Sequence, residues 1–428
     1  MKAALYTLGC KVNQYETEVM SEMLVKNGYM LTEYDSYADV YIVNSCTVTA
    51  ESDRKSRQAV RRFKKQNPDA VVVLTGCMSQ AFPEKAALIP EADIILGNNS
   101  NHKLIESIEK YKKTNQTVTD VTAHQNFDKF RSCCVYGFTG RTRATVKIED
   151  GCNRFCSYCI IPYARGRVRS KPLDELKKEI GVLEEAGFEE VVLVGINLSA
   201  YGSDSGLNIC DAVEACAEFK KIKRIRLGSL EPDHLTDEII ERLAKTEKLC
   251  PHFHISLQSG CDNTLKRMNR HYTAEEYYSL CLKLRRAFPG ASLTTDVMVG
   301  FAGETQEDFE ESLEFVKKVG FEKVHVFPYS IREGTRAASF PDQITNADKT
   351  NRSHIMSAAA DEIRLNFLSS QVGKAYEVLF EENVSGFSSG YTANYIPVKV
   401  KSDEHISGIH TVKILSCEND FCIGELVC

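Results

Sequence analysis

The sequence predicts an α/β protein in three parts: an open parallel sheet, a partial barrel of six strand–helix units, and a small antiparallel β-barrel. Short apolar runs of strand length alternate with amphipathic helical stretches, first up to about residue 125 and again from about 141 to 365. Beyond about residue 370 the helical period fades, and short strands are separated by Gly, Ser and Asn turns. These observations carry the fold class.

The length of 428 residues allows two or three domains, each with its own core. We expect domains at 1–125, 141–368 and 369–428, with a connector at 126–140. Expected strands of the first domain are 4–8, 40–43, 71–74 and 94–96. Those of the partial barrel are 144–148, 191–195, 224–230, 252–257, 292–301 and 323–329, and those of the small barrel are 376–380, 396–401, 410–415 and 422–427.

Composition excludes several classes of protein. A hydrophobic share of 43% with 26% charged residues is typical of a soluble globular chain, and no apolar run reaches the roughly 18 residues of a membrane span. The chain holds 16 cysteines, and its first residues are already strand-like, which argues against a secretory signal and a disulfide framework. We therefore expect a cytoplasmic protein with reduced thiols and no membrane partner.

The most specific motif is the C-x3-C-x2-C spacing of Cys152, Cys156 and Cys159. Three thiolates can hold three corners of an iron–sulfur cube, whereas electron-transfer clusters normally have four. An iron without a cysteine can chelate the amino and carboxylate groups of a molecule such as S-adenosylmethionine. Zinc is the alternative for closely spaced cysteines, but zinc sites usually show paired C-x2-C knuckles or a Cys/His set. The spacing thus favours a cluster that takes part in chemistry.

A second set of cysteines follows the predicted strands of the first domain. Cys10, Cys46 and Cys77 each come directly after an apolar strand. Ligands of open α/β sheets bind at the carboxyl ends of strands, so residues more than thirty apart in sequence can meet there. A single cysteine of this kind would be interpreted as a small buried hydrophobe. Repetition at three strand ends predicts a second metal cluster.

The other cysteines and two histidines are given structural roles. Cys133 and Cys134 fall in the connector, and most of the rest lie within helical or strand patterns; these are Cys210, Cys216, Cys250, Cys261, Cys281, Cys417, Cys422 and Cys428. His252 and His254 are interpreted as core or strand-surface groups, because neutral imidazoles are commonly buried in that way.

Basic residues gather in two places although the net charge is −6. One group surrounds the central cysteines, and the other lies on a predicted helix after Cys46: Arg54, Lys55, Arg57, Arg61, Arg62, Lys64 and Lys65. A solvated helix face and a nucleic-acid contact both explain such a group. The small C-terminal barrel is likewise compatible with oligonucleotide binding or with a structural cap.

Taken together, these motifs resemble the radical S-adenosylmethionine methylthiotransferases over the whole chain and in the expected order. Segments 7–16 (TLGCKVNQYE), 44–49 (NSCTVT) and 52–58 (SDRKSRQ) are similar to the branch that acts on N6-threonylcarbamoyladenosine in tRNA. Two departures are visible: Ala302 and Ser256 stand where the family usually has proline.

The resemblance implies a role for each motif. Cys10, Cys46 and Cys77 would bind an auxiliary [4Fe–4S] cluster, and the central triad the cluster that cleaves S-adenosylmethionine. The C-terminal barrel resembles the family's TRAM domain, implicated in RNA binding. The residues that resemble contacts to S-adenosylmethionine are Tyr158, Gly195, Asn197, Ser229, Glu231, Gln258, Arg270 and Asp296. No side chain is nominated as a general acid or base.

The implied reaction is methylthiolation of C2 of N6-threonylcarbamoyladenosine at tRNA position 37, beside the anticodon. One S-adenosylmethionine would give a 5′-deoxyadenosyl radical that abstracts the C2 hydrogen, and a second would provide the methyl group. Implied partners are the tRNA anticodon stem-loop, a one-electron donor such as flavodoxin or ferredoxin, and a sulfur donor system. With RNA as substrate, phosphate contact becomes the favoured role of Arg54, Lys55, Arg57, Arg61, Arg62 and Lys65.

Two alternatives remain open. A methylthiotransferase could act on isopentenyladenosine in tRNA or on a ribosomal protein residue with identical cluster chemistry. In another class of protein, the clusters would be structural or redox-sensing elements of a non-catalytic RNA-binding protein. Cleavage of S-adenosylmethionine separates the two classes.

Overall fold

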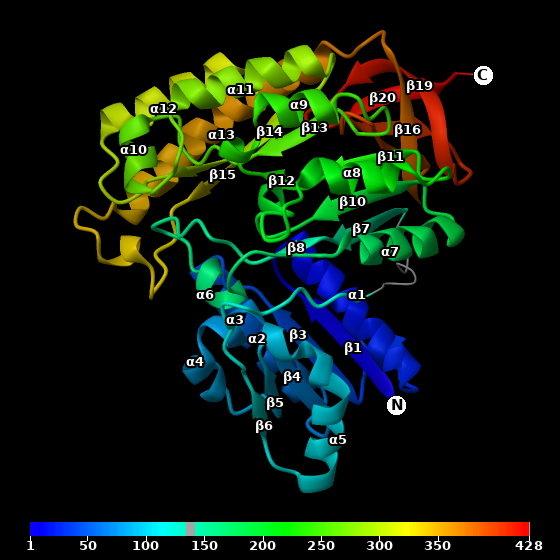
Figure 1. Cartoon of the computed structure of the whole chain (residues 1–428), viewed down its shortest axis with the longest axis vertical. Helices are drawn as coiled ribbons and strands as arrows, with labels where there is room; N and C mark the ends of the chain where they lie inside the picture. Colours follow the sequence, from blue (N-terminus) through cyan, green and yellow to red (C-terminus); the bar gives the residue numbers. More distant parts are fainter. Residues whose placement is uncertain (134–141, 428) are drawn as a thin grey trace.

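The computed structural model describes residues 1–133 and 142–427. Figure 1 shows the N-terminal sheet (blue and cyan) below, the strands and helices of the central barrel (green to orange) above it, and the C-terminal barrel (red) beside the central strands. The predicted connector at 126–140 lies partly outside the described residues. No helix within the described ranges is long and apolar enough to cross a bilayer.

The N-terminal part is an open sheet of six parallel strands in the order β2-β1-β3-β4-β5-β6. Apolar clusters lie on both of its faces, because helices cover both sides. The sheet confirms the predicted architecture. Its strands are β1 (Lys2–Thr7), β2 (Met30–Thr32), β3 (Val40–Ser45), β4 (Val71–Gly76), β5 (Ile94–Leu96) and β6 (Val118–Asp120), and its helices are α1 (Lys11–Lys26), α2 (Ala50–Gln66), α3 (Cys77–Ala81), α4 (Pro83–Ala87) and α5 (Leu104–Thr114).

The central part is a curved wall of parallel strands, hydrogen-bonded as β11-β10-β7 and β12-β13-β14-β15. The strand expected at 224–230 is divided at Gly228: its first half pairs with β10 and its second half with β13. Both halves continue one wall. The strands are β7 (Arg143–Lys147), β10 (Glu190–Val194), β11 (Arg224–Leu227), β12 (Ser229–Leu230), β13 (His252–Ile255), β14 (Ser292–Val299) and β15 (Lys323–Pro328).

Helices cover the outside of this wall and bury its largest apolar core. Capping boxes begin α8, α11 and α12, where Asn208, Thr273 and Thr305 accept backbone hydrogen bonds. The helices are α6 (Ile161–Arg165), α7 (Leu173–Glu185), α8 (Ile209–Ala217), α9 (Asp237–Leu243), α10 (Asp262–Arg267), α11 (Ala274–Ala287), α12 (Gln306–Val319) and α13 (Asn346–Ser369). A short hairpin, β8 (Glu149–Asp150) with β9 (Arg169–Ser170), flanks the central cysteines.

The C-terminal strands close into a barrel in the order β16-β17-β18-β20-β19. The predicted small barrel is confirmed, with one difference: β18 and β20 pair parallel, whereas the other pairs are antiparallel. The strands are β16 (Ala375–Val384), β17 (Phe387–Thr392), β18 (Pro397–Lys401), β19 (Gly408–Cys417) and β20 (Cys422–Leu426).

Polar contacts dock this barrel onto the N-terminal ends of the central strands. Arg226 donates to the Ala393 carbonyl at 3.0 Å, and Arg224 donates to the Glu377 carbonyl at 2.8 Å. Arg143 pairs with Glu381 at 2.6 Å. The C-terminal barrel therefore borders the interior of the central wall.

Candidate active site

Three neighbouring strands of the N-terminal sheet bring the first cysteine triad to one edge. Cys10 follows β1, Cys46 follows β3 directly, and Cys77 begins α3 after β4. Gly9, at φ +100°, lets the loop before Cys10 approach Cys46 closely, since a Cβ there would lie 2.9 Å from the Cys46 sulfur. Cys46 and Cys77 are buried, whereas Cys10 is exposed. The structure thus brings the triad together.

The central triad occupies the loop between β8 and α6. A Cβ on Gly151 would lie 2.0 Å from the Arg167 carbonyl oxygen, so only glycine fits this turn. The Cys152 amide donates to the Gly166 carbonyl at 3.0 Å, and the Cys159 amide donates to the Cys156 carbonyl at 3.0 Å. These bonds fold the loop so that the three cysteines lie close together.

The burial of cysteines in both triads fits a metal cluster, because its iron replaces the protons of the thiols. Burial, together with neighbouring cysteines, raises the pKa of Cys77 and of Cys152 to about 12. Burial also raises the pKa of Cys46 and of Cys159. A thiol with a raised pKa keeps its proton at neutral pH unless a metal displaces it. Loading of iron at either triad is therefore expected to release protons.

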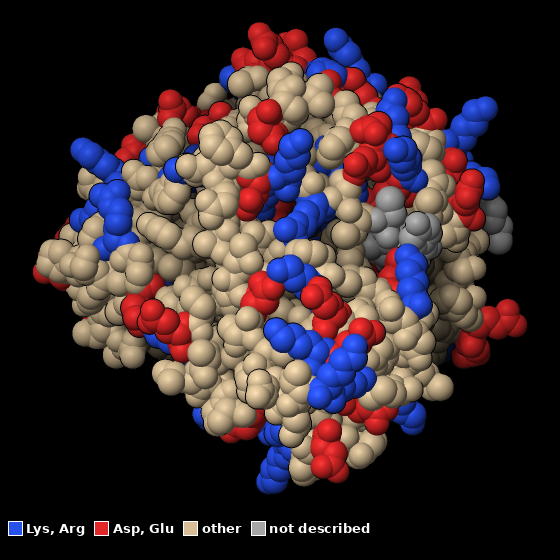
Figure 2. Space-filling view, turned by 60° about the horizontal axis from the view of Figure 1, so that its bottom comes forward, with Lys and Arg blue, Asp and Glu red and all other residues tan. Residues whose placement is uncertain are grey.

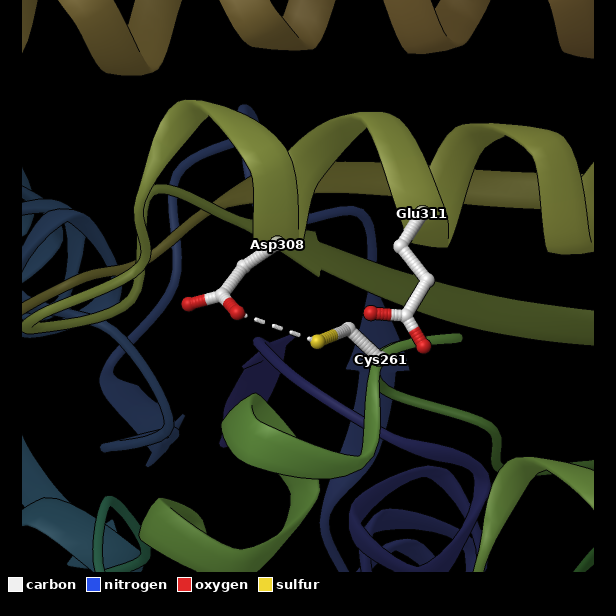
Figure 3. Close-up of side chains that lie close together, drawn as sticks. All are labelled: Cys261, Asp308 and Glu311. Carbon is white, nitrogen blue, oxygen red and sulfur yellow. Dashed lines mark hydrogen bonds between the residues drawn. The ribbon is translucent and has the colours of Figure 1, made fainter.

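Within the described ranges, the one group of side chains close enough together to bind a single metal ion lies outside both cysteine triads. Cys261, Asp308 and Glu311 place their ligand atoms within 4.8 Å of one another (Figure 3). Asp308 is already committed, because its carboxylate caps α12 at the Thr305 amide and binds Arg267 at 2.6 Å. Neither cysteine triad brings its three sulfur atoms within that distance of one another.

Two of the predicted S-adenosylmethionine contacts lie against the central triad. Arg270 donates to the Cys156 sulfur at 3.4 Å and forms an ion pair with Glu231. Arg154 lies 3.7 Å from the same Glu231 carboxylate. Burial would lower the pKa of Arg270, but nearby tyrosines and Glu231 outweigh it and raise that pKa, so the guanidinium stays charged. The structure brings Glu231, Arg270 and Cys156 together.

A second predicted pair lies where β10 ends. A Cβ on Gly195 would meet the Glu149 carboxylate at 2.6 Å, and the Asn197 amide donates to that carboxylate at 2.7 Å. The Asn197 side-chain oxygen is buried and has no hydrogen-bond partner among the described residues. It is therefore an acceptor available to a bound amino group.

Gln258 and Asp296 meet at the next pair of strand ends. The Gln258 amide donates to the Asp296 carbonyl at 2.9 Å, and Gln258 has a left-handed φ of 67°. The Asp296 carboxylate lies 3.3 Å from His254. Ser256, in place of the usual proline, offers its carbonyl to Arg270 at 3.2 Å. Tyr158 packs edge to face on Phe301, with ring centroids 6.3 Å apart.

A cavity of about 1100 Å³ borders part of these sites, and the central cysteine triad does not line it. It is lined by Cys10 of the first triad and by Gly195, Ser229 and Asp296 from the predicted cofactor set. Its other wall is the C-terminal barrel, including Tyr391. The cavity exceeds the roughly 300–1000 Å³ of ordinary small-molecule pockets. A substrate inside it would contact all three parts of the chain.

Several residues of the cavity wall are not among those predicted from the sequence. Lys11 lines the cavity beside Cys10, and Tyr391 and Tyr395 stack with ring centroids 4.7 Å apart. His252 and His254 were assigned to the core or strand surface, yet both line the cavity. Alternate residues of the barrel strands are polar, as in His252/His254, Ser292/Thr294/Asp296 and Lys323/His325. This period-2 pattern was the available signal.

The predicted RNA-contact residues lie on α2, away from the cavity lining. Arg54 pairs with Glu51 and Arg61 with Glu91, and Arg62 stacks on Phe63. Lys55, Arg57 and Lys65 have no such partner among the described residues. Figure 2, which turns the N-terminal part forward, shows basic side chains interspersed with acidic ones over that face.

Comparison with known proteins decides the family. Residues 146–316 match the model of the radical SAM superfamily, and residues 2–97 match that of the uncharacterized protein family UPF0004. The chain is 40% identical to the threonylcarbamoyladenosine tRNA methylthiotransferase MtaB of Bacillus subtilis, over 99% of this chain and 96% of that protein. The chain belongs to the radical SAM tRNA methylthiotransferase family. Its identification from sequence motifs is confirmed.

Other relatives of this methylthiotransferase carry two different names. The Thermotoga maritima protein named threonylcarbamoyladenosine tRNA methylthiotransferase MtaB is 36% identical, over 98% of each chain. A tRNA-2-methylthio-N(6)-dimethylallyladenosine synthase from Caldicellulosiruptor saccharolyticus is also 36% identical, over 99% of this chain and 92% of that protein. Family membership is thus shared by enzymes with different adenosine substrates.

Solved structures support the fold of the methylthiotransferase. The radical S-adenosylmethionine methyltransferase TsrM from Kitasatospora setae superposes with a TM-score of 0.57 and 13% identity, over 91% of this chain and 80% of that one. At this identity the likeness concerns the fold alone. The cofactors of the enzyme follow from its family: S-adenosylmethionine and two [4Fe–4S] clusters.

The remaining cysteines agree with their structural interpretation. Six of them are buried within the core, and Cys417 is half-buried; the six are Cys210, Cys216, Cys250, Cys261, Cys281 and Cys422. Cys134 and Cys428 lie outside the described residues.

Proposed function

We propose that this enzyme methylthiolates C2 of N6-threonylcarbamoyladenosine at position 37 of tRNA, giving 2-methylthio-N6-threonylcarbamoyladenosine. The observation that carries the proposal is the single cavity bordered by Cys10, by Gly195, Ser229 and Asp296, and by the C-terminal barrel. Relatives named for this substrate at 35–40% identity support the choice of nucleoside.

We assign the six triad cysteines as cluster ligands and the eight predicted contact residues as the S-adenosylmethionine site. When bound, the clusters supply the electron that cleaves S-adenosylmethionine to a 5′-deoxyadenosyl radical, and the sulfur that is transferred. Arg270 holds positive charge beside Cys156, and Asn197 offers a buried oxygen to the amino group of the cofactor. The enclosed wall limits access of water to the reacting carbon.

The RNA must reach the cavity as an unpaired nucleotide, because a base is accessible only when it leaves its stack. An anticodon loop satisfies this condition. After each reaction the clusters must regain an electron and a sulfur atom from outside the chain. We propose a flavodoxin or ferredoxin as the electron donor and a sulfur donor system as the source of sulfur. We place the reaction in the cytoplasm, and we propose domains at 1–125, 141–368 and 369–428.

The test uses anaerobically reconstituted enzyme and synthetic anticodon stem-loops that differ only at position 37. We expect mass spectrometry of digested RNA to show the methylthio product from the loop with threonylcarbamoyladenosine. Product from the dimethylallyladenosine loop instead would assign the enzyme to the other branch. Absence of both 5′-deoxyadenosine and product would favour a non-catalytic RNA-binding protein.

A further inference from the structure

The side chains of Lys11 and Lys323 line the cavity without a hydrogen bond, salt bridge or ring contact to any described residue, and Lys11 is the one that adjoins Cys10. Lys11 is the first residue of α1 and directly follows Cys10. Its side chain is accessible and lines both the main cavity and an adjoining hollow of about 290 Å³. It has no hydrogen bond or salt bridge with any residue that the structure describes. Its ammonium group is therefore free to pair with an anion that enters the cavity.

The neighbouring cations are already neutralised or committed. Arg143 pairs with Glu381 at 2.6 Å, and Arg226 pairs with the buried Glu190 at 2.7 Å. Arg224 lies 3.9 Å from the same Glu190. The three arginines thus have carboxylate partners in Glu190, Glu377 and Glu381, whereas Lys11 has none among the described residues. An anionic group that enters this part of the cavity would therefore meet Lys11 as the cation without a carboxylate partner.

The other basic residues of the cavity lining are less suitable. Arg364 lies 3.3 Å from Asp420, and the Lys399 ammonium rests over the Phe421 ring at 3.8 Å. Lys323 begins β15. This strand forms one edge of the central wall, and β7 forms the opposite edge. Helix α1 packs against β7. Among the described residues, Lys11 is therefore the unpaired cation nearest to Cys10.

The two adenosine substrates of the family differ in charge at the corresponding group. A threonylcarbamoyl substituent carries a free carboxylate, which is ionised at neutral pH. A dimethylallyl substituent is uncharged and apolar. Burying the carboxylate without a cation would be costly, whereas a lysine can meet it with three donors on a flexible stem.

We propose that Lys11 binds the threonyl carboxylate of the substrate and thereby determines the preference of this enzyme for threonylcarbamoyladenosine. The inference rests on the proposed function, and it adds the residue that recognises the substituent on the adenosine. The contact fixes the modified adenosine beside Cys10, because Lys11 and Cys10 are adjacent in the chain. A charged hydrogen bond of this kind discriminates strongly against an analogue that lacks the anion.

The test compares fully reconstituted wild type with Lys11→Gln, Lys11→Arg and the matched control Lys323→Gln. Three anticodon stem-loops carry adenosine, threonylcarbamoyladenosine or its neutral methyl ester at position 37. We expect wild type and Lys323→Gln to bind the carboxylate loop at least about tenfold more tightly than the ester loop. Lys11→Gln should bind both equally, and Lys11→Arg should keep most of the preference. Iron content must remain at the wild-type value in all variants.

Three outcomes would overturn the inference. Lys11→Gln could retain the preference for the carboxylate loop. It could lose affinity for all three loops by the same factor, which would assign Lys11 to a backbone phosphate. It could lose half of its iron, which would make Lys11 a support of the first cluster. A wild-type enzyme that modifies only a different nucleoside would instead overturn the proposed function itself.

Discussion

Arg165 links the helix that follows the central triad to Cys77 of the first triad through one buried guanidinium. It ends α6, the helix that begins just after Cys159, and its Nε lies 3.2 Å from the Cys77 sulfur. Its other nitrogens bind the Glu16 carboxylate, one of them at 2.9 Å, and the Asn13 side chain. Burial disfavours the charged form, but Cys77 and Glu16 raise the pKa of Arg165 well above its usual value.

Arg165→Met should lower the free energy of unfolding by about 3 kcal/mol, because it leaves the buried Glu16 with only Lys147 as partner. Urea denaturation measures this loss. The control Lys178→Gln, which breaks an exposed pair with Asp174, should change stability by less than about 0.5 kcal/mol. Equal effects of the two substitutions would show that the guanidinium is not a structural link.

Cys156 and Cys261 offer a matched pair of buried thiols. Cys156→Ala should abolish formation of 5′-deoxyadenosine and remove about half of the iron, since two thiolates hold a cluster poorly. Cys261→Ala should preserve both, at a cost of about 1 kcal/mol in stability. Chromatography of the nucleoside and iron analysis measure these quantities. Loss of iron in Cys261→Ala would make the Cys261, Asp308 and Glu311 group a metal site.

Among the helices and strands, those whose hydrophobic pattern matches their burial are predicted best from the sequence. Strands β3 and β4 are wholly buried apolar runs, and their identification needed no tertiary information. Edge strands β2 and β6 were missed because they are three residues long and partly exposed. Strand β17 was missed because Phe387–Thr392 contains Ser, Ser and Gly, which favour turns locally, and only barrel closure makes it a strand.

Helix α2 presents three cations that neither form an ion pair with any described residue nor stack on the ring of one. The reversals Lys55→Glu, Arg57→Glu and Lys65→Glu should weaken tRNA binding and reduce the slope of log affinity against log salt by about one for each phosphate that is no longer neutralised. Filter binding at several salt concentrations measures both. The control reverses Lys110 and Lys113 on α5, and it should change neither. An unchanged slope in the α2 variant would leave α2 as a solvated helix face.

At the scale of the whole molecule, buried charges hold the N-terminal sheet against the central barrel. Lys147 binds Glu16 at 2.8 Å and Asp150 at 2.8 Å. On the other side, Arg332 binds Asp53 at 2.7 Å. Burial would raise the pKa of Glu16, but Arg165 and Lys147 outweigh it and hold the pKa below its ordinary value of 4.5.

This lowered pKa gives the interface a defined pH dependence. A carboxylate with a lowered pKa stabilises the fold fully above its ordinary pKa, and that contribution is lost as pH falls through the lower folded value. The stability difference between wild type and Glu16→Gln should therefore be constant from about pH 7 to pH 5 and should shrink below about pH 4. Urea midpoints over this range measure it. A difference that grows on acidification would contradict the assignment.

The arrangement of the site could be predicted only in part. Both triads follow from local rules, because strand ends and short cysteine spacing are visible in the sequence. The cavity depends on docking of the C-terminal barrel through contacts such as Arg226 with Ala393, which are 167 residues apart. Such contacts leave no periodic signal, so the position of Lys11 at the cavity wall came only from the structure.

The substrate is tested most directly by mass spectrometry of modified nucleosides in tRNA from source cells with and without this gene. Deletion of the gene should abolish 2-methylthio-N6-threonylcarbamoyladenosine and cause N6-threonylcarbamoyladenosine to accumulate. An unchanged profile, in cells without a second enzyme of this activity, would contradict the assigned substrate.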